Sequence, residues 1–82
     1  MPTVLRIGRA RVVIYPNDHL PPHVHVVDGD KHAKVTLPRE QPDEHPRVVE
    51  VHGFSRVELA RILEAVDVAS PELRKDWRRI HG

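Results

Sequence analysis

The stretch that organises the predicted fold is YPNDHLPPHVHVV, residues 15–27. Its second half alternates histidine with valine, and successive side chains of a β-strand point to opposite faces of the sheet. Val24 and Val26 predict the face that packs on a core, so His23 and His25 are expected on an open face or along a groove. The two prolines before the strand fix φ and hold its entry extended. The sequence thus predicts a rigid polar loop that leads into a half-buried strand.

The sequence predicts two β-hairpins, one before the loop at residues 16–22 and one after it. Residues 3–7 and 10–15 are rich in β-branched side chains and favour two strands, joined by a two-residue turn at Gly8-Arg9. Residues 23–28 and 31–37 favour a second pair, joined at Asp28-Gly29-Asp30.

The second turn allows two registers. In one register His25 faces His32 and His23 faces Lys34; in the other His25 faces Lys34 and His23 faces Thr36. Both registers keep the valines on the core side, so the hydrophobic pattern leaves both open.

The C-terminal part of the chain is predicted to be helical. Residues 47–51 first favour a short fifth strand, and Ser55 with Glu58 then forms a capping box before an apolar repeat at helical spacing. Ser70-Pro71 predicts the start of a second helix, because serine caps helices and proline fits the first turn. The expected fold is α+β: an antiparallel β-sheet of four to five strands, then two C-terminal helices packed on one face, in a single domain over residues 1–82.

Composition narrows the class of protein. The 82 residues include no cysteine, which excludes disulfides and thiolate zinc sites. A net charge of +1 does not by itself predict nucleic-acid binding. No apolar run approaches the roughly 20 residues of a membrane helix, and the first residues lack the apolar core of a signal peptide, so we expect a cytoplasmic protein. Residues 38–46 hold three prolines and are expected to form a mobile loop.

The first candidate site is a metal centre at His23 and His25, completed by His19 or Asp18. Two imidazoles on one strand face can reach one divalent transition metal such as zinc, and the preceding loop supplies a third ligand. The simpler interpretation is a pair of exposed strand histidines next to a turn that Asp18 caps through its own backbone.

The second candidate is metal-independent acid–base catalysis, for example cleavage of an RNA phosphodiester. His23, His25 and His19 are the candidate catalytic residues, since neighbouring imidazoles share acid and base roles near neutral pH. The candidate binding residues are five side chains around them: Arg11 and Lys34 for phosphate charge, Tyr15 for stacking on a base, and Asn17 and Asp18 for shaping the loop.

The third candidate is an interaction module. An exposed sheet edge or the basic side of the last helix would dock a small protein partner, a second copy of the chain, or nucleic acid. Acidic residues dilute the basic helix face, so a solvated surface is the simpler interpretation there. Because no nucleophile–base–orienter set can be read from the chain, binding is favoured over catalysis.

Several stretches together resemble the small prokaryotic family known as domain of unknown function 4160. The most specific is NDHxPPHVHV at residues 17–26, followed by PTVLR at 2–6, Gly53-Phe54-Ser55 with Glu58-Leu59, and Trp77. The chain departs from the family pattern at Tyr15-Pro16 and in the loop at 38–46. The resemblance implies a small cytoplasmic protein, often encoded beside another short protein, that acts in a toxin–antitoxin-type module.

Overall fold

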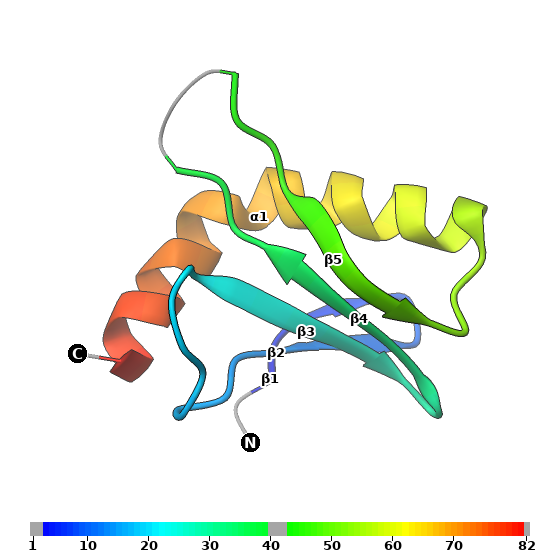
Figure 1. Cartoon of the computed structure of the whole chain (residues 1–82), viewed down its shortest axis with the longest axis horizontal. Helices are drawn as coiled ribbons and strands as arrows, with labels where there is room; N and C mark the ends of the chain where they lie inside the picture. The colour runs from blue at the N-terminus through cyan, green and yellow to red at the C-terminus, as the bar shows by residue number, and fades with distance from the viewer. Residues whose placement is uncertain (1–2, 40–42, 82) are drawn as a thin grey trace.

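The computed structural model describes residues 3–39 and 43–81 of the chain. A five-stranded antiparallel sheet comes first, and one helix then crosses one of its faces (Figure 1). The elements are β1 (Thr3–Ile7), β2 (Ala10–Val13), β3 (His23–Asp28), β4 (Lys31–Thr36), β5 (Arg47–His52) and α1 (Arg56–His81). Each strand pairs with its neighbour in sequence, so the sheet is a simple meander. The predicted antiparallel sheet is confirmed; Pro2 and part of the predicted loop, residues 40–42, lie outside the described residues.

Both tight hairpins have glycine at the first turn position. Gly8 has φ of +58° and Gly29 has φ of +61°, a region that glycine enters without a steric penalty. Asp28 pairs with Lys31, so Gly29 and Asp30 are the central residues of the second turn. Of the two registers left open by the sequence, the structure therefore has the one in which His25 faces Lys34.

The core lies between α1 and one face of the sheet. Val24 and Val26 are fully buried there, as the alternation in β3 predicted, together with Ile62 and Val66 of the helix. Complete burial of such a side chain contributes about 1.5–3 kcal/mol to folding. In the part of the chain that the structure describes, α1 reaches the opposite face of the sheet only near the start of β3, where Trp77 lies against the His23 ring.

The prediction of two C-terminal helices is wrong, because α1 continues through Pro71. The Ser70 hydroxyl does not cap a new helix; it donates a hydrogen bond of 2.7 Å to the Val66 carbonyl, one turn back. Proline lacks the N–H that would bond to the Asp67 carbonyl, and Figure 1 shows α1 bending along this part of its length. The bend keeps Leu73 and Trp77 in the core.

The predicted capping box at the start of α1 is confirmed. The Ser55 hydroxyl accepts a hydrogen bond of 3.1 Å from the Glu58 N–H, and a Glu58 carboxylate oxygen accepts one of 2.8 Å from the Ser55 N–H. The other Glu58 oxygen lies 2.8 Å from Nζ of Lys31, at the β3–β4 hairpin. Hydrogen bonds from Lys31 first, and from the Ser55 backbone next, lower the pKa of Glu58 to about 2. This cluster joins the helix start to the sheet.

Across residues 3–39 and 43–81, no helix has both the length and the apolar character needed to cross a bilayer.

The Lys31–Glu58 pair predicts a pH dependence of stability in acid. The ionised Glu58 stabilises the fold fully above pH 4.5, and this contribution is lost as the pH falls from 4.5 through about 2. We expect Lys31→Met to flatten the pH dependence of urea unfolding in this window, because the largest cause of the shift is removed. Lys75→Met is the matched control, since Lys75 pairs with Glu72 where both side chains are largely exposed. An unchanged slope in Lys31→Met would contradict the assignment.

Candidate functional site

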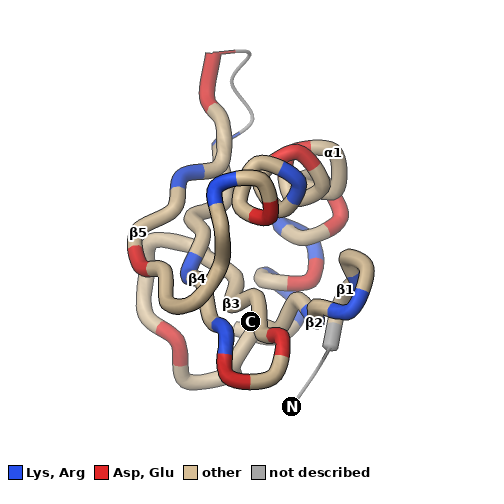
Figure 2. The backbone as a smooth tube through the Cα atoms, turned by 90° about the vertical axis from the view of Figure 1, so that its right-hand side faces the viewer, with Lys and Arg blue, Asp and Glu red and all other residues tan. Residues whose placement is uncertain are grey.

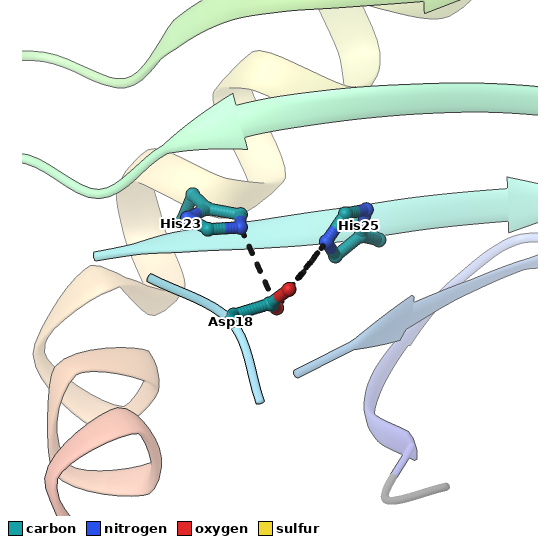
Figure 3. Close-up of side chains that lie close together, drawn as sticks. All are labelled: Asp18, His23 and His25. Atoms are coloured by element: carbon teal, nitrogen blue, oxygen red, sulfur yellow. Dashed lines mark hydrogen bonds and ion pairs between the residues drawn. The ribbon is translucent and has the colours of Figure 1, made fainter. Parts of the chain in front are cut away.

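The candidate site lies where the loop after β2 returns to the start of β3. The Asp18 N–H donates to the Tyr15 carbonyl at 3.1 Å, and an Asp18 carboxylate oxygen, Oδ2, accepts from the Tyr15 N–H at 3.2 Å. These two bonds form the turn that Asn17 and Asp18 predicted. The turn does more than cap itself, because it holds the carboxylate over the beginning of β3 (Figure 3).

Two imidazoles converge on that carboxylate. Nε2 of His23 lies 3.4 Å from Oδ2 of Asp18, and Nε2 of His25 lies 3.2 Å from the same oxygen. His25 is also 3.3 Å from Oδ1. Figure 3 shows both rings on the same side of β3, as period-two alternation requires. One potential ligand atom from each of the three residues lies within 4.8 Å of the others.

The second ring nitrogen of each histidine has its own partner. Nδ1 of His23 lies 2.9 Å from the Pro21 carbonyl, which can only accept, so Nδ1 carries the proton. In the neutral ring, Nε2 of His23 then presents a lone pair to the carboxylate. Two acceptors face each other at that point, which is favourable only when a proton or a cation lies between them.

His32 supports His25 from the neighbouring strand. Nδ1 of His25 lies 3.0 Å from Nε2 of His32, and the two rings stack with centroids 5.3 Å apart. His25 faces Lys34 directly in the β3–β4 ladder, so the contact with His32 is diagonal. Sequence reasoning placed His32 beside His25 only in the register that the structure does not have, and therefore left His32 out of the site.

We expected both histidines on an open face or along a groove, and an open position does not hold for His23, which is buried. The His23 side chain is only 6% exposed, whereas the His25 side chain is 14% exposed. The indole of Trp77 lies 5.4 Å from the His23 ring, because the bent second half of α1 reaches the start of β3. Trp77 belongs to the core and also covers the site.

The environment sets the charge of the site. Burial by itself would raise the pKa of Asp18, but the Tyr15 N–H and the two imidazoles outweigh it and lower that pKa below its usual value. Burial lowers the pKa of His25, and the Asp18 carboxylate offsets this only in part. Near neutral pH the site therefore holds an ionised carboxylate beside a neutral His25.

The remaining predicted site residues lie at different distances from the cluster. The Tyr15 ring meets His25 edge-on with centroids 4.7 Å apart. Lys34 is directly opposite His25, and Arg11 is two ladder positions away, opposite Val27. His19 and Asn17 are exposed in the loop, and within the described residues no hydrogen bond, ion pair or ring contact joins His19 to the cluster. Alternation located the strand histidines, but no sequence signal gives the direction of a loop side chain.

The site predicts an acid-shifted titration of His25. We expect its pKa below 6.5, and a further fall in Asp18→Asn, because the carboxylate stabilises the imidazolium. The pKa of His25 is lower in the folded protein than in the unfolded chain. The contribution of neutral His25 to folding stability is therefore complete above pH 6.5 and is lost as the pH falls through the folded-state pKa. NMR of the ring nitrogens across pH measures both effects, and His19→Gln should leave the His25 curve unchanged. A pKa that rises in Asp18→Asn would refute this account.

Comparison with known families identifies the chain at the family level. A family model described as domain of unknown function 4160 (DUF4160) matches residues 10–78, a span that contains Asp18, His23, His25, His32 and Trp77. Comparisons with curated proteins and with solved structures give no match. The family expected from the sequence is thus confirmed: the chain belongs to the DUF4160 family.

Proposed function

We propose that this protein binds a divalent transition metal ion through Asp18, His23 and His25. The observation that carries the proposal is the convergence of two Nε2 atoms on one carboxylate oxygen, while the Pro21 carbonyl holds the proton of His23 on Nδ1. A cation between these atoms would remove the conflict between the His23 lone pair and the carboxylate.

The spacing of the ligand atoms supports a small ion. Nitrogen and oxygen ligands about 2.0–2.1 Å from a tetrahedral zinc ion lie roughly 3.3 Å from one another. The two nitrogen–oxygen distances here are 3.4 Å and 3.2 Å. Two imidazoles and one carboxylate form a ligand set found in catalytic zinc sites and in non-haem iron sites. Three protein ligands would leave a coordination position for water or a substrate.

The surrounding residues support the same function. Metal-binding histidines usually donate their second N–H to a fixed acceptor, and Pro21 and His32 stand in these positions for His23 and His25. The ionised Asp18 and neutral His25 match the protonation states that a metal requires. These partners would orient the rings before the ion arrives.

Metal-independent acid–base catalysis by the same histidines is the alternative. It is favoured by the same conflict of acceptors, because protonation of His23 would also let it pair with Asp18. Zinc binding separates the two proposals, since a site that works through a proton would gain nothing from the ion.

The metal proposal predicts ligand-linked stability. At zinc concentrations about 100-fold above Kd, the chelator-treated protein should gain about 2.7 kcal/mol, which raises the Tm of a domain of this size by about 10 °C or more. Asp18→Asn and His25→Gln should lose affinity by more than about 100-fold, beyond the range typical of outer-sphere changes. Calorimetric unfolding with and without zinc measures these effects.

The exposed histidines provide matched controls for the zinc experiment. His19→Gln and His52→Gln should bind zinc as the wild type does, because neither residue belongs to the three-residue cluster. An unchanged Tm and unmoved ring resonances of His23 and His25 in the wild type would refute the metal proposal.

A second candidate function is assembly with another polypeptide, as in a toxin–antitoxin-type module. It is favoured by an apolar groove between β1 and α1, whose lining includes Leu5, Ile7, Ala65, Val68 and Ala69. β1 is an edge strand of the sheet, and Val68 is 80% exposed. An added strand would pair with β1 and place alternate side chains in this groove.

This candidate predicts self-association through the groove when the protein is the only chain present. Sedimentation velocity should show a concentration-dependent dimer, and Val68→Glu should shift it to monomer by placing a charge against apolar surface. Val57→Glu is the matched control, because Val57 is 62% exposed on the same helix and does not line the groove. A wild-type protein that stays monomeric at all concentrations would exclude the homo-oligomer.

A further inference from the structure

We propose that the face of the sheet opposite α1 binds single-stranded nucleic acid and holds one backbone phosphate beside His25. The inference rests on the proposed function, because it names the class of ligand that would be brought to the metal site. Binding itself uses other residues, so the two proposals can fail separately.

The strand register aligns polar side chains in rows across this face. Residues directly opposite each other in an antiparallel ladder share a face of the sheet. One row crosses all five strands through the residues Arg6, Arg11, Val27, His32 and His52. At roughly 4.8 Å between strands, this row extends over about 19 Å. The next row contains Val13, His25, Lys34 and Glu50.

The charge of this face is positive. Four cations of its described strands, Arg6, Arg11, Lys34 and Arg47, stand against two carboxylates: Glu50 in β5, and the ionised Asp18 that the preceding loop holds over the start of β3. The whole chain carries only +1, and Figure 2 shows acidic and basic residues interspersed along α1. The positive charge is therefore concentrated on this face of the sheet, which would attract a polyanion electrostatically.

The cations of the face are also available. Within the described residues, Lys31, Arg39 and Arg79 each form an ion pair at 2.8 Å. Arg11 and Lys34 form none there, although Lys34 stands opposite Glu50 in the ladder. Unpaired cations at fixed positions on a rigid sheet are suited to backbone phosphates, whose binding releases counterions.

The uncharged residues of the face favour a nucleic acid over a protein partner. Val13 is completely buried and Val27 is half-buried, so β2 and β3 offer little apolar area to a protein interface, and the exposed valines of the sheet, Val49 and Val51, are confined to β5. Instead the face carries the rings of His25, His32 and His52, with Tyr15 beside His25. Histidine, tyrosine and arginine planes are surfaces on which unpaired bases stack, and an open antiparallel sheet is a known platform for single strands.

The register places the phosphate-binding cations next to the candidate metal site. Lys34 faces His25 across the β3–β4 ladder, and Arg11 lies in the adjoining row on the β2 side. A phosphate held between Arg11 and Lys34 would lie over His25, whose Nε2 contacts Asp18. The arrangement thus directs a phosphodiester toward the three converging side chains.

Fluorescence anisotropy with chelator-treated protein tests the inference. The probe is a fluorescein-labelled single-stranded RNA of about 12 nucleotides, within the site sizes typical of single-strand-binding domains. The wild type should bind, and Arg11→Ala combined with Lys34→Ala should weaken binding about tenfold or more. The slope of log K against log salt should fall by about 1.4, since each phosphate contact with a single strand contributes about 0.7.

A matched double variant on the other side of the molecule provides the control. Lys75→Ala with Arg78→Ala also removes one lysine and one arginine, but from exposed positions on α1, and should bind as the wild type does. Circular dichroism and Tm establish that both double variants are folded. No binding by the wild type at low salt, equal losses in both double variants, or equal binding of duplex RNA would each overturn the inference.

One further variant separates this inference from the metal proposal. Asp18→Asn should lose zinc and keep the RNA probe, because Asp18 is not among the phosphate-binding cations. A wild type that binds zinc but not RNA would overturn only the inference about the sheet face. A wild type that binds RNA but not zinc would overturn only the metal proposal.

Discussion

Burial of Val24 and Val26 under α1 is the constraint on which the rest of the molecule depends. Both side chains are fully buried, so β3 cannot rotate or slip by one residue without moving them into water. The same constraint fixes the histidines between and beside them on the opposite face. Packing in the hydrophobic core therefore fixes the geometry of the site. The imidazoles themselves need contribute little to the stability of the fold.

Local patterns predicted the elements that depend on neighbouring residues. The alternation in β3, the two-residue turn at Gly8-Arg9 and the Ser55–Glu58 capping box all appear in the structure as expected. The second helix predicted at Ser70-Pro71 was wrong, because a Ser-Pro pair is compatible both with the start of a new helix and with a bend inside a continuous one. Here the burial of Leu73 and Trp77, after the proline, favours the continuous, bent helix. Such a decision depends on contacts between distant segments.

The site was predicted only in part, because local patterns place side chains along one strand but do not give contacts between strands. His23 and His25 could be placed on one side of β3 from the period of a strand, but His32 reaches His25 diagonally, and diagonal contacts require the register. The register itself was undecided, because valines on both strands fit either pairing. His19 shared the loop with Asp18, yet the turn that directs Asp18 inward leaves His19 exposed.

The bend in α1 has a consequence for how the molecule can be observed. It brings Trp77, which is the only tryptophan in the chain, close to His23, with ring centroids 5.4 Å apart. The His81 ring stacks on the same indole, with centroids 3.8 Å apart. Indole emission depends on its immediate surroundings, and here two imidazoles are among them. The chain thus carries an intrinsic optical reporter at the edge of its own candidate site, so occupancy of that site can be followed without any added label.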